Sequence, residues 1–213
     1  MEEKKPLIVY MEQTPNPNAL KYVCSHLLLA DGSLEFLTKR EAINCPLAYQ
    51  LFDFTGVRGV FISQNFVTIT KEKDLDWWEI QNILREFIRG FLLSGEPIID
   101  NKIAAGTLDF EEHVEKPALT PETQNNPKAA PAQLLSNDEI EKRIIATLDE
   151  YVRPAVAMDG GAIDFRAFEN GKVTLVLKGS CNGCPSSTVT LKQGIERVLK
   201  SMVPGVEEVV AVN

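Results

Sequence analysis

Two cysteines stand three positions apart in the stretch 179–184, which reads GSCNGC, and Pro185 follows directly. Thiolates bind soft metals and attack disulfides, so a C-x-x-C pair predicts a site that holds a metal or exchanges electrons. The alternative is that Cys181 and Cys184 are two incidental small apolar residues, which the intervening Gly183 and the helix expected after it disfavour. The chain therefore predicts a site at this loop.

Two elements position the pair. Residues 172–178 (KVTLVLK) alternate and are rich in β-branched side chains, which is typical of a strand. Residues 186–202 carry apolar side chains at helical spacing, and Pro185 suits a first helical position because its missing N–H is not needed there. Cys184 then lies beside a helix N-terminus, where unpaired amides favour a thiolate, so a lowered thiol pKa is expected for it.

Three chemistries fit a C-x-x-C pair at this place. An iron–sulfur or zinc site needs four ligands as a rule, and residues 136–213 offer two thiols and no histidine. Two chains that each supply one pair would complete a tetrad, which implies a metal-bridged homodimer. A thioredoxin-type dithiol is the second reading, although this helix is the last of its domain rather than the first of a βαβ unit. Structural zinc is the third, and it too would require a dimer.

Residues 1–115 predict an α+β domain. Strands are expected at 7–11 and 19–23, a short helix at 46–54, a hairpin at 57–63 and 66–71, and a helix at 74–94 that Gly95 ends. Residues 116–135 contain four prolines and no periodicity, so they predict a flexible linker and two domains that move independently.

Residues 136–213 predict a second small domain. A helix begins at a capping box of Ser136 and Glu139 and stops at Pro154. A hairpin follows about Asn170-Gly171, then the cysteine loop, the long helix and a last strand at 206–212. The order α-β-β-loop-α-β buries one face of a small sheet under helices, so the fold class is α+β with two small sandwich-like domains.

The net charge, the apolar runs and the first residues restrict the partners and the cellular location that we expect. The net charge of −8 argues against a nucleic-acid binder. No apolar run is long enough for a membrane span, and the first residues resemble neither a signal nor a transit peptide, so a cytoplasmic protein is expected.

Other residues that invite a functional reading have simpler explanations. Cys24 and Cys45 are isolated cysteines, which are commonly buried apolar residues. Trp77 and Trp78 are adjacent, so at most one of them faces the core of a helical layer. Asp159 precedes Gly160-Gly161 and is expected to be a turn residue rather than a catalytic one.

Longer motifs resemble a known family. The stretches MDGGAIDF, GSCNGCPSSTVTLKQGIE and MVPGVEEV resemble the C-terminal domain of the NifU/Nfu iron–sulfur proteins. The stretches TPNPNALKY and VRGVFISQNFVTIT resemble the Nfu N-terminal domain. Together these resemblances cover nearly the whole chain outside the linker.

The resemblance implies a scaffold or carrier in iron–sulfur cluster assembly, which is not an enzyme. It implies that a 4Fe–4S cluster is held between two chains by the residues matching the family's cysteines, Cys181 and Cys184. The homodimer would pass the cluster to apo iron–sulfur proteins. The chain lacks the assembly-scaffold and ferredoxin-like domains of the longer NifU type, which implies that an upstream scaffold supplies its cluster.

Overall fold

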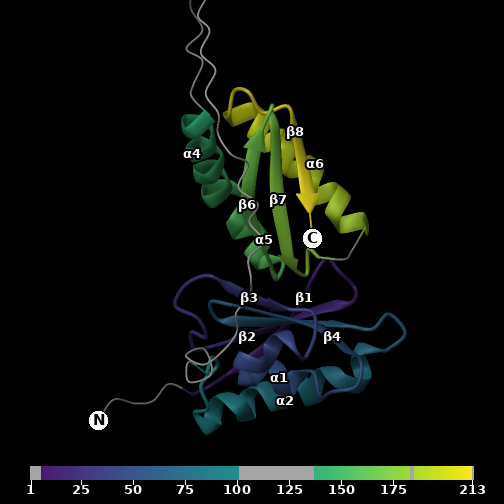
Figure 1. Cartoon of the computed structure of the whole chain (residues 1–213). Helices are drawn as coiled ribbons and strands as arrows, with labels where there is room; N and C mark the ends of the chain where they lie inside the picture. Colours follow the sequence, from purple (N-terminus) through teal and green to yellow (C-terminus); the bar gives the residue numbers. More distant parts are fainter. Residues whose placement is uncertain (1–5, 101–136, 183–184, 213) are drawn as a thin grey trace, which may run out of the picture.

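A computed structural model describes residues 6–100, 137–182 and 185–212, and it shows two α+β domains (Figure 1). The proposed linker 116–135 and the capping residue Ser136 lie outside the described residues. The domain limits at 115/116 and 135/136 therefore stay predictions.

The N-terminal domain is built on one antiparallel sheet. Its strands follow the order β1-β2-β5-β4-β3. They are β1 (Val9–Gln13), β2 (Ala19–Cys24), β3 (Ser33–Phe36), β4 (Val57–Ser63) and β5 (Phe66–Lys71). The expected strands and the β4–β5 hairpin are confirmed, whereas β3 was not predicted, because four residues are too few for a clear alternation.

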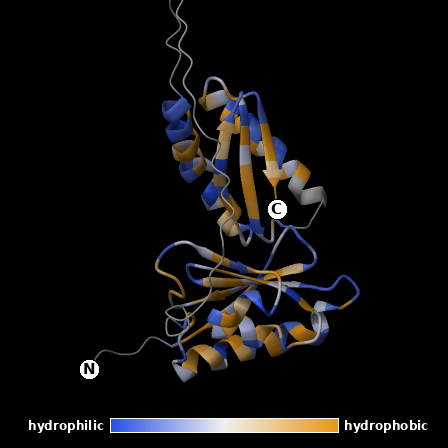
Figure 2. Cartoon of the chain, in the orientation of Figure 1, coloured by the Kyte–Doolittle hydropathy of each residue, from blue (hydrophilic) through white to orange (hydrophobic). Residues whose placement is uncertain are grey.

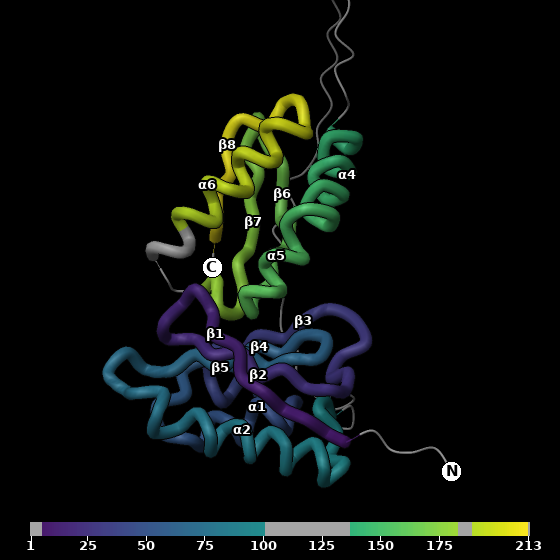
Figure 3. Tube along the Cα trace, turned by 180° about the vertical axis from the view of Figure 1, so that it is seen from behind, coloured from purple at the N-terminus to yellow at the C-terminus, as the bar shows by residue number. Residues whose placement is uncertain are grey.

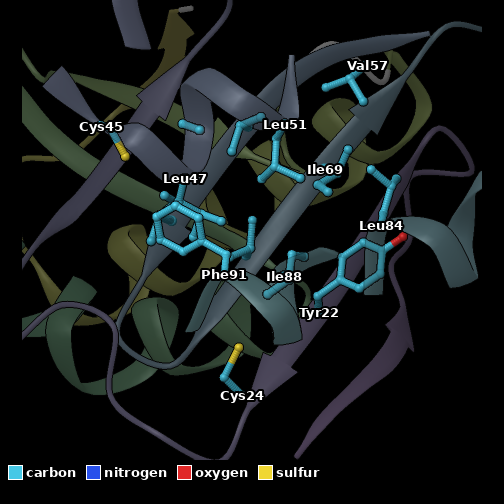
Figure 4. Close-up of a cluster of buried hydrophobic side chains, with 14 of the residues drawn as sticks. Tyr22, Cys24, Cys45, Leu47, Leu51, Val57, Ile69, Leu84, Ile88 and Phe91 are labelled. Atoms are coloured by element: carbon cyan, nitrogen blue, oxygen red, sulfur yellow. The ribbon is translucent and has the colours of Figure 1, made fainter. Parts of the chain in front are cut away.

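Helices cover one face of this sheet. They are the short 3₁₀ helix η1 (Glu41–Asn44), α1 (Pro46–Leu51) and α2 (Trp77–Ser94). α2 ends as predicted at Gly95, whose φ of 76° is the left-handed conformation that glycine adopts without strain. Figure 4 shows Leu84, Ile88 and Phe91 of α2 packed with side chains of the sheet and α1. None of the helices in the described ranges has the length and apolar character that a membrane span requires.

The opposite face of the same sheet is also covered. Along β2, Leu20 and Tyr22 point into the core under the helices, while Lys21 and Val23 point to the other side. All six residues of β2 are nevertheless buried. A strand buried on both faces needs a second layer, and here that layer is the C-terminal domain, which stands on the sheet opposite α1 and α2 (Figure 1).

The C-terminal domain has a three-stranded sheet with helices on one face (Figure 3). Its strand order is β6-β7-β8, in which β6 and β7 form an antiparallel hairpin and β8 runs parallel to β7. The elements are α4 (Asn137–Thr147), η2 (Leu148–Val152), α5 (Arg153–Met158), β6 (Gly161–Glu169), β7 (Lys172–Gly179), α6 (Pro185–Met202) and β8 (Glu208–Val212). Asn170 and Gly171 form the predicted turn with positive φ angles of 48° and 77°. Apolar residues of the sheet and the helices form one buried core, and Figure 2 shows the hydrophobic colouring along the strands and helices that contribute to it.

The prediction that Pro154 stops the first helix of this domain is wrong. The helical path continues through a π turn, in which the N–H of Arg153 donates to the carbonyl oxygen of Leu148, five residues earlier. Pro154 lies in the first turn of α5, where its missing N–H breaks no helical hydrogen bond. The π turn thus places Pro154 at the start of a new helix, and the helical path continues to the turn at Asp159-Gly160.

The structure shows the two domains in contact, and the expectation that they move independently stays a prediction. The C-terminal domain contacts the N-terminal sheet through hydrogen bonds and an apolar cluster. The pattern of prolines at 116–135 indicates a tether, but a tether permits both a docked and a separated arrangement of the domains that it joins.

Candidate functional site

Cys181 lies on the loop that joins β7 to α6. β7 ends at Gly179 and α6 begins at Pro185, so the strand–loop–helix arrangement predicted around the cysteines is confirmed. Cys181 is only 7% exposed and packs with the core of the C-terminal domain. Cys184 lies outside the described residues, so its role as the second thiol of the site stays a prediction.

The turn between α5 and β6 holds the start of this loop. The hydroxyl of Ser180 donates to the carbonyl oxygen of Asp159 at 2.5 Å, and its N–H donates to that of Gly160 at 3.2 Å. A Cβ atom at Gly161 would lie 2.7 Å from Cys181 Sγ and 2.8 Å from the carbonyl oxygen of Lys178. The sulfur therefore occupies space that any other residue at 161 would take, and Asp159 is the turn residue that the sequence predicted.

Burial raises the pKa of the Cys181 thiol above its ordinary value, and the Ser180 hydroxyl opposes the shift only partly. The lowered pKa that the sequence predicted concerns Cys184, outside the described residues. Cys181 keeps its proton at neutral pH in the chain without a metal, and binding of a metal would have to displace that proton.

Residues of the N-terminal domain form hydrogen bonds with the same loop. Glu35 on β3 accepts a hydrogen bond of 2.8 Å from the N–H of Gly179 and one of 3.4 Å from the side-chain amide of Asn182. Asn16, in the turn between β1 and β2, donates its side-chain amide to the carbonyl oxygen of Ser180 at 3.1 Å. In Figure 3 this turn lies directly against the end of β7. Both sides of Cys181 along the chain are therefore bonded to the other domain.

A second pair of contacts holds the α5–β6 turn. Thr68 on β5 donates its hydroxyl to the carbonyl oxygen of Gly160 at 2.7 Å. The ammonium group of Lys21 donates to the carbonyl oxygen of Met158 at 3.2 Å and also pairs with Glu12 at 3.0 Å. An apolar cluster also spans the contact between the domains. In it, Val23, Phe61 and Phe66 of the N-terminal sheet pack against the partly buried Ala162 of β6.

Sequence reasoning missed these N-terminal residues. The signal for two of them was a polar side chain inside an otherwise apolar strand, Lys21 in ALKYVC and Thr68 in FVTITK. A polar residue at such a place faces either water or a second layer, and periodicity cannot tell which. Nothing in the sequence around Glu35 indicated that it reaches the cysteine loop.

An apolar groove opens beside Cys181. It has a volume of about 660 Å³ and lies between η2 and α5 on one side and α6 on the other. Its apolar lining includes Tyr151, Val152, Val156, Leu191, Ile195 and Val198, and Pro15 of the N-terminal domain also lines it. The thiol thus borders a space that another molecule can enter.

Cys24 and Cys45 belong to the core of the N-terminal domain, as the structural reading predicted. They are 1% and 2% exposed and point into the apolar cluster (Figure 4). Burial raises the pKa of Cys24 to about 12. Trp77 is packed against the same core while Trp78 is 85% exposed, which confirms that only one of the two faces inward.

The described part of the chain contains no group of three or more His, Cys, Asp or Glu side chains arranged to hold a metal ion. A four-ligand metal site at Cys181 would therefore need ligands from beyond the described residues. A thiol beside an open groove fits a soft metal whose remaining ligands come from elsewhere.

Comparison with known proteins decides the family. Residues 9–95 match the family model described as the scaffold protein Nfu/NifU N-terminal domain, and residues 144–210 match the NifU-like domain. The chain belongs to the Nfu/NifU family of scaffold proteins. The cysteine loop thus belongs to the NifU-like domain, and the residues that bond to it from the other side belong to the Nfu N-terminal domain.

Individual relatives span most of this Nfu/NifU chain. A human protein named NFU1 iron-sulfur cluster scaffold homolog, mitochondrial, is 35% identical over 95% of this chain and 71% of its own length. A NifU-like protein of Schizosaccharomyces pombe is 34% identical over 94% of this chain and 71% of its own length. A relative in Drosophila persimilis, with the same name as the human protein, is 35% identical over 97% of this chain and 65% of its own length.

These names overturn one expectation. The cytoplasmic location expected from the first residues is wrong, since the human and Drosophila relatives are named as mitochondrial. The expectation depended on a missing transit peptide, and such leaders are removed from mature proteins, so their absence does not decide the compartment.

Proposed function

We propose that this Nfu/NifU protein binds a 4Fe–4S cluster between two chains through Cys181 and Cys184 and transfers it to apo-proteins. The observation that carries the proposal is the position of Cys181, on a strand–loop–helix turn and beside an open groove. The family supports an iron–sulfur cluster as the group that is bound, because relatives are named as iron-sulfur cluster scaffolds.

The donor set argues for two chains. A 4Fe–4S cluster takes four cysteine ligands as a rule, and the NifU-like domain contains two cysteines. One pair from each of two chains completes the set, so cluster binding and dimerisation are coupled. The groove beside Cys181 shows only that the sulfur is not enclosed on all sides.

A cluster shared between chains is suited to transfer rather than to catalysis. The bridged dimer must offset the entropy cost of association, which a client with all four ligands on one chain does not incur. Such a client gains the cluster by ligand exchange, so the cluster is cargo and the protein acts as a carrier. An upstream scaffold would supply the cluster.

A dithiol oxidoreductase is the alternative; it is disfavoured with Cys181 as the attacking thiol, whereas Cys184 lies outside the described residues. Burial raises the pKa of this thiol, whereas an attacking cysteine needs a thiolate near neutral pH. Structural zinc is the other alternative, and it would need the same pair of chains as the cluster.

Anaerobic reconstitution with iron and sulfide tests the proposal. We expect a brown dimer with about four irons and four sulfides per pair of chains, measured by visible absorbance, metal analysis and mass. Cys181→Ala and Cys184→Ala should abolish the colour and leave the far-UV spectrum unchanged. Cys24→Ala, which removes a buried thiol of the other domain, is the matched control and should load normally. A cluster that remains intact in Cys181→Ala, or a colourless protein that holds zinc, would contradict the proposal.

A further inference from the structure

The face of the N-terminal sheet opposite α1 and α2 carries side chains that are typical of a buried surface. Of the six buried polar or charged residues in the described ranges, four lie at the contact between the domains, namely Asn16, Lys21, Thr68 and Ser180. The side chains of Asn16, Lys21 and Thr68 donate to carbonyl oxygens across the contact. Ser180 accepts the bond from Asn16 with its backbone oxygen, while its hydroxyl donates to Asp159 of its own domain, so every one of these buried polar groups is bonded. Phe61 and Phe66, only 2% and 3% exposed, would form an exposed apolar patch if this face were open to water.

What covers this face is the cysteine loop and the glycine turn that supports it. The N-terminal side chains bond mainly to backbone groups of the loop, namely the N–H of Gly179 and the carbonyl oxygens of Ser180 and Gly160. Such bonds depend on how closely the two backbones approach. The surface therefore recognises a tight, glycine-rich loop.

The glycines of the loop make that approach possible. A Cβ atom at Gly160 would lie 2.9 Å from Thr68 Oγ1, and one at Gly179 would lie 2.9 Å from a ring carbon of Phe61. Both glycines also have positive φ angles, 81° and 67°. These two positions thus serve the contact with the N-terminal domain as well as the turn itself.

We propose that the N-terminal domain is a cap on the cysteine loop of its own chain, and that this closed state must open before a second chain can share a cluster. The proposal rests on the proposed function for its second half. It assigns to the N-terminal sheet face, formed by Asn16, Lys21, Glu35, Phe61 and Thr68, the role of regulating access to the site.

The closed state and the bridged dimer compete for the same space. A cluster with cysteine ligands from two chains is only a few atoms across, so sharing it would bring the cysteine loops of the two chains close together. In the closed state the β1–β2 turn lies against each loop, and Pro15 of that turn lines the same groove as Cys181. Two loops that each carry a docked domain on this side cannot meet there without displacing it.

The test uses the full chain with two substitutions on the N-terminal face. Glu35→Ala removes the acceptor for Gly179, and Thr68→Val removes the hydroxyl with little change of shape. Glu79→Ala is the matched control, since Glu79 is an exposed residue of α2 on the far side of the sheet. Hydrogen exchange of the Gly179 amide, followed by NMR, reports docking directly because this N–H donates to Glu35.

We expect the Gly179 amide to exchange about tenfold faster in Glu35→Ala/Thr68→Val than in the wild type, the factor that loss of a buried hydrogen bond typically produces. The control should match the wild type. Reconstitution with iron and sulfide should then proceed severalfold faster in the double variant. Equal loading rates in the variant and the wild type would overturn the cap, as would a Gly179 amide that already exchanges freely in the wild type.

The two proposals fail in different ways. Hydrogen exchange needs no cluster, so a chain that docks normally but never takes up iron and sulfide would overturn the proposed function and leave the docking surface standing. A chain that loads a cluster while its Gly179 amide is unprotected would overturn the cap and leave the proposed function standing.

Discussion

Glu35 of the N-terminal domain accepts a hydrogen bond of 2.8 Å from the backbone N–H of Gly179, two residues before Cys181. Burial raises the pKa of this carboxyl group, and the bond from Gly179 offsets that shift in part. The residues are 144 positions apart in the chain. The position of the cysteine loop therefore depends on a side chain of the other domain.

A double-mutant cycle should detect this dependence. Glu35→Ala and Asn182→Ala each remove one partner of the 3.4 Å bond between the domains. We expect a coupling free energy of about 0.5–1 kcal/mol in urea unfolding, the usual size for a hydrogen bond between neighbouring side chains. The pair Glu79→Ala and Asn182→Ala should be additive, because Glu79 lies on α2. A coupling of zero for the first pair would contradict the contact.

Gly161→Ala should disturb the cysteine loop. The added methyl group would lie 2.7 Å from Cys181 Sγ and 2.8 Å from a backbone oxygen, so the loop has to shift. We expect a loss of about 1–3 kcal/mol in the free energy of unfolding, together with weaker cluster uptake. Gly90→Ala is the control, since a Cβ atom at this position meets nothing within 4 Å. Because alanine is favoured over glycine inside a helix, this substitution should not lower the free energy of unfolding. Normal uptake by Gly161→Ala would show that the close approach is unimportant.

The buried thiol of Cys24 should make the protein less stable in alkali. Its pKa is raised to about 12 in the folded chain, while an unfolded thiol loses its proton near about 8.5. Between these values the folded state binds the extra proton, so the free energy of unfolding falls as the pH rises, by at most about 1.4 kcal/mol per pH unit. Urea midpoints between pH 8 and 10 measure this fall. Cys24→Ala should reduce the slope, and an unchanged slope would count against the shift.

Two neighbouring isoleucines on α4 should differ in their contribution to stability. Ile144 is fully buried in the core of the C-terminal domain, whereas Ile145 is 36% exposed. Ile144→Ala should lower the free energy of unfolding by about 2–4 kcal/mol, and Ile145→Ala by less than about 1 kcal/mol. Urea unfolding compares them directly. Equal losses would mean that α4 is rotated from the orientation described here.

Sequence reasoning succeeded where a signal is local and failed where it is not. The β4–β5 hairpin, the turn at Asn170 and the end of α2 at Gly95 each depend on residues within a few positions, and all three are confirmed. Pro154 was misjudged because a proline is compatible with a new first turn as well as with a stop, and a π turn decides between them. β3 was missed because its four residues carry too short a pattern.

The sequence by itself determined that Cys181 follows a strand and that a helix begins at Pro185, because periodicity and proline chemistry act between near neighbours. It also indicated that Cys24 and Cys45 are core residues. Only the tertiary structure decided that Asn16, Glu35 and Thr68 meet the cysteine loop. The physical reason is that a contact between domains depends on the fit of two finished surfaces, and neither a strand pattern nor a linker specifies which faces come together.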